Sequence, residues 1–139
     1  MEPSEGEQLG TAALALVGAP FRMHGRDPAT GLDCVGVAVA GLAAIGRAVS
    51  PPADYRLRGG CLVRFDRWAS ACGLVHAPSL ALPAIGDVLL CIVGPQQFHV
   101  MIDTGAVLVH AHAGLRKVTA IPGPAPWPIV RRWRLQEMR

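Results

Sequence analysis

Apolar residues recur at helical spacing in the first half of the chain. One stripe with the spacing of an amphipathic helix comprises Leu9, Ala12, Ala13, Leu16 and Val17. Small and aliphatic residues from Val37 to Ile45 favour a second, buried helix, and apolar residues at helical spacing between Leu62 and Cys72 favour a third. Gly and Pro residues between the first two segments predict a loop from Phe21 to Leu32.

The hydrophobic pattern changes from helical to extended after Gly86. Short β-rich runs, separated by turns that contain Gly or Pro, predict strands at Val88–Val93, Phe98–Asp103, Val107–His112, Arg116–Ile121 and Ile129–Leu135. Helices followed by strands are typical of an α+β fold with an antiparallel sheet. We therefore expect the N-terminal helices to pack on an antiparallel sheet of five to six strands.

Size and composition indicate one domain that spans residues 1–139. The chain is 51% hydrophobic and 17% charged, and its net charge is +3. The basic residues are scattered except near the C-terminus and form no nucleic-acid-binding motif, so we expect no nucleic-acid partner. The apolar run from Ala12 to Val17 is too short for a membrane span or for the core of a signal peptide. We therefore expect cytoplasmic synthesis without a signal peptide, and no membrane span.

Cys34 is the candidate nucleophile among the four cysteines. Asp33 is a typical N-cap residue, which places Cys34 in the first turn of the buried helix. Free N–H groups and the positive end of the helix dipole favour the thiolate there. The alternative is that Cys34 is only a small hydrophobic residue. The other cysteines lack CxxC spacing. We expect them to fill the core: Cys61, Cys72 and Cys91.

Two histidines are candidates for the base and for the group that orients it. Alternation places His110 and His112 on one face of a strand, and the Thr104-Gly105 turn makes that strand a hairpin partner of the one that carries His99. His99 would take the proton of the Cys34 thiol and stabilise the thiolate as an ion pair. His110 would fix the tautomer of His99.

The histidines also allow a different interpretation. His99, His110 and His112 could supply three nitrogen ligands to a metal ion. We favour the thiol interpretation because a metal site leaves Cys34 unexplained, and we therefore expect neither a metal nor a cofactor. His112 is expected to face solvent at a strand end, and His24 and His76 are expected to lie in loops.

Several segments of the chain resemble, in the same order, motifs of the NlpC/P60 cysteine peptidases of bacterial cell walls. They are Leu16–Arg22, which resembles G-T-P-Y-R, Gly31–Gly36, which resembles G-x-D-C-S-G, Gly86–Leu89, which resembles G-D-L-V, His99–Ile102, which resembles H-V-G-I, and Val109–Ala111, which resembles I-H-A. The resemblance extends from Leu9 to Leu135 and is weakest between Val49 and Pro83. It implies a papain-like core.

The resemblance also implies a reaction. Cys34 would be the nucleophile, His99 the base and His110 the third polar residue of a Cys-His-His triad. The implied activity is hydrolysis of the bond between D-γ-glutamate and diaminopimelate in peptidoglycan stem peptides, without a metal. Transfer of the acyl group to an amine instead of water stays open.

Two positions depart from the family motifs near the implied substrate site, which would include Phe21, Arg22, Asp33 and Val35. Phe21 stands where the family has Tyr, which removes a hydroxyl. Val35 stands where the family has Ser, which removes a polar contact. These departures leave open a catalytically weak or inactive phage-tail, assembly or wall-binding protein on the same fold.

The short, single-domain form resembles the phage-associated branch of the family. Its members travel with a phage tail or act during lysis. The resemblance therefore implies a phage-tail or lysis partner, and a location in the phage particle or delivery to the cell wall.

Overall fold

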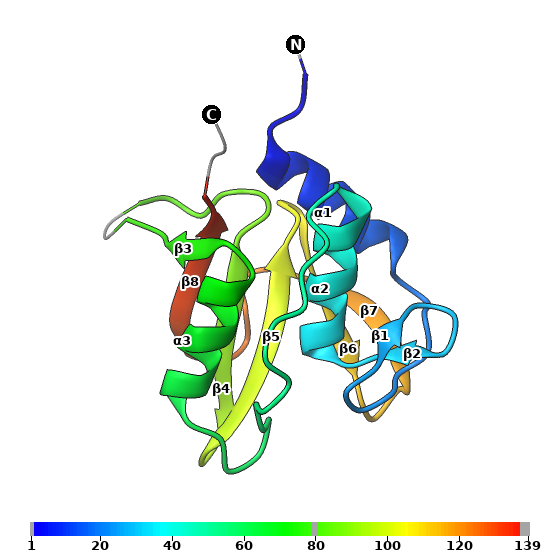
Figure 1. Cartoon of the computed structure of the whole chain (residues 1–139), viewed down its shortest axis with the longest axis vertical. Coiled ribbons are helices and arrows are strands. Elements are labelled where there is room, and N and C mark those ends of the chain that lie inside the picture. The colour runs from blue at the N-terminus through cyan, green and yellow to red at the C-terminus, as the bar shows by residue number, and fades with distance from the viewer. Residues whose placement is uncertain (1, 79–80, 137–139) are drawn as a thin grey trace.

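The computed structural model describes residues 2–78 and 81–136 and has one main antiparallel sheet (Figure 1). Its six strands lie in the order β3-β8-β4-β5-β6-β7. Their bounds are β3 (Leu74–His76), β4 (Val88–Gly94), β5 (Gln97–Asp103), β6 (Val107–His112), β7 (Lys117–Pro122) and β8 (Ile129–Leu135). The predicted α+β architecture is confirmed, and the predicted strands correspond to β4 through β8.

Three helices in the described residues pack on one face of this sheet (Figure 1). They are α1 (Glu5–Ala15), α2 (Cys34–Ala44) and α3 (Leu62–Ala71). The predicted second and third helices are confirmed. The first helix begins earlier than its apolar stripe because Ser4 and Glu7 form a capping box, in which the Ser4 hydroxyl accepts the Glu7 N–H at 3.1 Å. None of the described helices is long and apolar enough to cross a membrane.

The short edge strand β3 was not predicted. It follows α3 closely and pairs with β8 from Leu74 opposite Leu135 to His76 opposite Trp133. A strand of three residues is too short to show alternation in the sequence. The prediction that His76 lies in a loop is therefore wrong.

Apolar side chains pack on both faces of the sheet. The main core lies between the helices and the sheet, and its largest buried residues include Tyr55, Phe65, Trp68 and Trp133. A smaller cluster on the opposite face is covered by the Pro-rich connection that carries Trp127, and its buried members are Leu89, Cys91, Met101 and Leu108. Cys72 and Cys91 are buried as predicted, whereas Cys61 is exposed at the N-cap of α3.

A small hairpin delivers the chain to α2. Its strands are β1 (Arg26–Asp27) and β2 (Gly31–Leu32), within the segment predicted to be a loop. The backbone before this hairpin approaches the first turn of α2 closely, since a Cβ at Gly36 would lie 2.1 Å from the Gly25 carbonyl oxygen. Only glycine fits at position 36 without a shift of that backbone.

Strands β5 and β6 pair only where they meet at their shared turn. The paired positions are Ile102 with Val109 and Asp103 with Leu108, whereas β5 stays paired with β4 as far as Gln97. The start of β5 bonds instead to the segment before α3, because the Phe98 N–H donates to the Leu57 carbonyl at 2.7 Å. Beyond their shared turn, β5 and β6 therefore separate, and the sheet is open between them.

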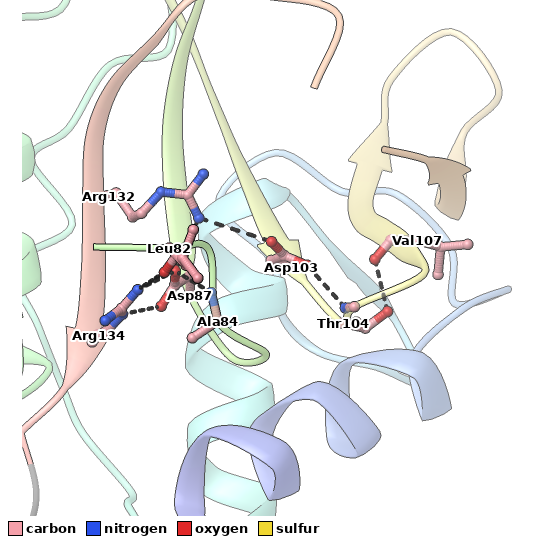
Figure 2. Close-up of polar contacts among 9 residues, drawn as sticks. Leu82, Ala84, Asp87, Asp103, Thr104, Val107, Arg132 and Arg134 are labelled. Carbon is pink, nitrogen blue, oxygen red and sulfur yellow. Dashed lines mark hydrogen bonds and ion pairs between the residues drawn. The ribbon is translucent and has the colours of Figure 1, made fainter. Parts of the chain in front are cut away.

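A buried carboxylate on the other side of the molecule ties β8 to the turn before β4 (Figure 2). Asp87 Oδ2 accepts the N–H of Ala84 at 3.0 Å and a hydrogen bond from Arg132 at 2.9 Å, and Oδ1 accepts one from Arg134 Nε at 2.7 Å. Arg132 also lies 3.8 Å from Asp103 at the end of β5. The Gly-Asp motif at this turn thus holds β8 against the start of β4.

Candidate active site

Cys34 is the first residue of α2 and is almost completely buried, at 2% exposure. The predicted cap is confirmed: Asp33 is the N-cap, and its Oδ1 accepts the Gly36 N–H at 2.7 Å. This bond fixes the first turn of the helix, and with it the position of the thiol.

The Asp33 carboxylate is held by three further donors, two from the segment before α2 and one from the loop before α3. The Tyr55 hydroxyl donates to Oδ2 at 2.7 Å, the His24 N–H donates to the same oxygen at 3.0 Å, and Arg26 Nη1 donates to Oδ1 at 3.2 Å. Arg26 also donates to the Tyr55 hydroxyl at 2.7 Å. These bonds satisfy a carboxylate that is 0% exposed. Asp33 therefore supports the helix start and does not face the solvent-filled side of the site.

His99 and His110 make direct contact. His99 Nε2 lies 2.7 Å from His110 Nδ1, and His110 Nε2 lies 3.3 Å from the hydroxyl oxygen of Thr119. The Trp127 ring packs edge-on against His99, with ring centroids 5.6 Å apart. His112 lies beside His110, with ring centroids 5.8 Å apart, but its Nδ1 accepts the N–H of Leu115 at 3.0 Å.

One cavity of about 530 Å³ joins the nucleophile and base candidates. It is lined by Cys34 and His99, by Phe21, and by the wall residues Met23, His24, Arg56, Leu57, Arg58, Val93, Gln97, Phe98, Ala111 and Ala113. Within the described residues, no hydrogen bond joins the Cys34 sulfur to His99, so the two groups share the cavity without direct bonding.

The remaining residues of the predicted substrate site lie outside the cavity lining. Arg22 is exposed beside it, and Val35 is fully buried in the main core. Phe21 is the one of that predicted set that lines the cavity. In the described part of the chain, no three His, Cys, Asp or Glu side chains converge as metal ligands.

Burial keeps the thiol protonated. It raises the pKa of Cys34 to about 12, and the neighbouring Asp33 carboxylate adds to the rise. Hydrogen bonds with the backbone of Val100, Val35 and Cys34 itself oppose it. The prediction of a resting thiolate is therefore wrong. Burial and the adjacent carboxylate raise the pKa of the thiol more than the backbone hydrogen bonds lower it.

Burial also keeps both histidines neutral. It lowers the pKa of His99 to about 4, with further lowering by His110 and His112. It lowers the pKa of His110 to about 4 as well, with a smaller effect from His112. At neutral pH the site therefore holds a neutral thiol and two neutral imidazoles, not the predicted thiolate–imidazolium ion pair.

Solved structures share this arrangement of helices and sheet, although no protein-family model and no curated protein matches the chain. The P60 domain of an antigen from Mycobacterium avium subspecies paratuberculosis is 19% identical with a TM-score of 0.61, and the match covers 94% of this chain and 93% of that domain. The chain has the NlpC/P60 fold.

Two longer proteins show the same fold. The peptidoglycan hydrolase RipB from Mycobacterium tuberculosis is 20% identical with a TM-score of 0.63, over 96% of this chain and 66% of that one. NlpC2 from Trichomonas vaginalis is 16% identical with a TM-score of 0.66, over 96% of this chain. The chain spans about half the length of the Trichomonas protein, at 48%.

Sequence reasoning missed several residues that complete this site on the NlpC/P60 fold. Tyr55 and Arg26 hold Asp33, but neither lies in a periodic segment. Trp127 lies in a Pro-rich connection that gives no sign of its contact with His99. Thr119 could have been found, because pairing of the two strands that flank the turn at Gly114 places it directly opposite His110.

Proposed function

We propose that the chain is a cysteine peptidase that hydrolyses the bond between D-γ-glutamate and diaminopimelate in peptidoglycan stem peptides. The observation that carries the proposal is that Cys34 and His99 line one cavity while His110 contacts His99 Nε2 at 2.7 Å. The shared fold with a peptidoglycan hydrolase supports the substrate class. The order of the Cys34, His99 and His110 motifs supports the roles of these residues.

The contact between His99 Nε2 and His110 leaves His99 Nδ1 as the nitrogen that can accept the thiol proton. As the proton moves to Nδ1, the backbone groups of Cys34 and Val100 that bond to the sulfur stabilise its developing negative charge, and the sulfur attacks the substrate carbonyl carbon. His99 then gives that proton to the leaving amine, which leaves a thioester on Cys34.

Hydrolysis of the thioester completes the cycle. His99 takes a proton from water, the resulting hydroxide attacks the carbonyl carbon, and the proton returns to the sulfur as the carboxylic acid leaves. Because the resting groups are neutral, the ion pair exists only while the substrate reacts. The proposed mechanism therefore uses general-base activation of a thiol, not a stored thiolate.

The raised pKa of Cys34 favours a second candidate, a binding or assembly protein that has lost turnover on the same fold. Alkylation by iodoacetamide does not separate the two, since a thiol that is neutral at rest reacts slowly in either case. Turnover of a defined substrate does separate them.

The decisive experiment incubates the protein with a γ-D-glutamyl-diaminopimelate peptide and follows both products by mass spectrometry. We expect cleavage by the native chain and by Cys61→Ala, an exposed matched control, and no cleavage by a folded Cys34→Ala variant. Cleavage that persists in Cys34→Ala contradicts the proposal. Binding without cleavage by the native chain favours the second candidate.

A second set of variants tests the orienting role. His110→Ala should lower kcat by about 100-fold, because His99 loses the partner that fixes its tautomer. His112→Ala should change kcat by less than about threefold, since His112 bonds to its own turn. The reverse order of effects contradicts the assignment of His110.

A further inference from the structure

We propose that Thr119 is a positioning residue, which supplies the acceptor that lets His99 keep Nδ1, the nitrogen not engaged by His110, free of a proton. The catalytic consequence rests on the proposed function. The tautomer that Thr119 supports is a property of the folded chain and can be measured without a substrate.

The three side chains form a continuous path across neighbouring strands. Thr119 of β7 is paired directly with His110 of β6, so both side chains lie on the same face of the sheet. The path runs from the Thr119 hydroxyl oxygen to His110 Nε2 at 3.3 Å, and from His110 Nδ1 to His99 Nε2 at 2.7 Å. Both ring nitrogens of His110 are therefore engaged.

A contact between two neutral imidazoles holds one proton, and its position decides the tautomer of both rings. If His99 Nε2 carries the proton, His99 Nδ1 is free to accept one, and His110 carries its own proton on Nε2. If His110 Nδ1 carries the shared proton, the proton of His99 must sit on Nδ1. His99 Nδ1 is then a donor and cannot take the thiol proton.

The Thr119 hydroxyl can serve both arrangements, because it donates to His110 Nε2 in the second and accepts from it in the first. Only the first arrangement needs Thr119 as an acceptor for a buried N–H. In that arrangement His110 Nε2 is a donor, and His110 is a buried residue at 2% exposure. A buried N–H without an acceptor is costly, so this tautomer depends on the Thr119 hydroxyl oxygen. Thr119 is only partly buried, and its hydroxyl can direct its own hydrogen to water while it accepts from His110.

Replacement of Thr119 by valine keeps the shape and strand preference of the side chain but removes the acceptor. His110 then places its proton on Nδ1 and donates to His99 Nε2, which pushes the proton of His99 to Nδ1. We expect Thr119→Val to lower kcat by roughly tenfold, the size of one hydrogen bond, with KM changed by less than about twofold. Thr119→Ser, which retains the hydroxyl, should restore kcat to within about threefold of the native value.

The experiment combines kinetics on the peptide substrate with ¹⁵N NMR of the histidine rings in the substrate-free chain. In the native chain we expect the proton of His99 on Nε2 and that of His110 on Nε2, and in Thr119→Val we expect both on Nδ1. Thr11→Val, which removes a hydroxyl on the exposed face of α1, is the matched control and should change neither measurement.

The outcomes separate this proposal from the proposed function. If the native chain cleaves nothing, the proposed function fails, and the NMR spectra still test the path through Thr119. A native His99 protonated on Nδ1, or a Thr119→Val variant with native tautomers, overturns the path. An equal loss of kcat in Thr119→Ser and Thr119→Val indicates a merely structural role and also overturns it.

Discussion

Asp33 and Asp87 are buried carboxylates that solve the same local problem in two different regions. Each is 0% exposed, each accepts a backbone N–H of its own turn, and each is bonded to arginine. Each also lies at the start of an element, α2 for Asp33 and β4 for Asp87. The two differ in what lies next to them.

Asp87 forms ion pairs with two arginines of β8, and these contacts join strands. Asp33 meets one arginine and a tyrosine, and the next residue is the candidate nucleophile. The Asp33 charge therefore acts on chemistry, because it raises the pKa of the Cys34 thiol. The comparison shows that a cap which positions a thiol can also hold it in the protonated form.

The largest expected effect is the loss of folding stability when Asp87 is replaced. Asp87→Ala leaves Arg134 without its carboxylate and Arg132 with only Asp103 at 3.8 Å, and we expect a loss of about 3 to 5 kcal/mol in the free energy of unfolding, measured by urea denaturation. Asp54→Ala removes an exposed ion pair with Arg64 and should cost less than about 1 kcal/mol. Equal losses would show that the Asp87 cluster adds nothing beyond a surface pair.

The next effect is on the thiol and distinguishes the two carboxylates. Asp33→Asn removes the negative charge beside Cys34, so the pKa of Cys34 should fall below its native value of about 12. Asp87→Asn should leave that pKa unchanged. Site-resolved alkylation rates measured against pH give both values, and an unchanged Cys34 titration in Asp33→Asn would rule out an effect of the carboxylate on the thiol.

The last effect is the pH dependence of stability that the histidine pair sets. Burial lowers the pKa of His99 from 6.5 to about 4, so the folded chain binds fewer protons than the unfolded chain between these values. The contribution of neutral His99 to the stability of the fold is therefore fully present above pH 6.5 and is lost as the pH falls toward 4. We expect the melting temperature to decline over that range.

A matched variant isolates this effect. The double variant His99→Gln and His110→Gln should show a shallower decline in melting temperature over the same range, because both titrating groups are absent. An identical slope in the variant and in the native chain would assign the pH dependence to the carboxylates instead.

Local patterns in the sequence predicted the parts of the fold that depend on local rules. The N-cap at Asp33, the buried α2 and the hairpin between β5 and β6 follow from residue type, spacing and turn chemistry. The early start of α1 and the short β3 were missed, because a capping box and a three-residue edge strand leave no apolar periodicity.

The candidate site was predicted less completely, because its energetics depend on residues far apart in the chain. Tyr55 reaches Asp33 from a segment without periodicity, and this contact is visible only in the folded structure. The charge state of Cys34 could not be predicted from its place at a helix start, since burial by the surrounding core outweighs the backbone hydrogen bonds that lower the pKa of the thiol.

The segment before α3 can change the side chains that it adds to the cavity wall without losing its position. Leu57 and Gly59 fasten it to the start of β5 through backbone hydrogen bonds of 2.7 and 2.8 Å, which do not depend on side-chain identity. Arg56 and Arg58 alternate with these anchors and line the cavity. Evolution or a designer can therefore exchange these two side chains to change the cavity wall while the backbone bonds that hold it remain.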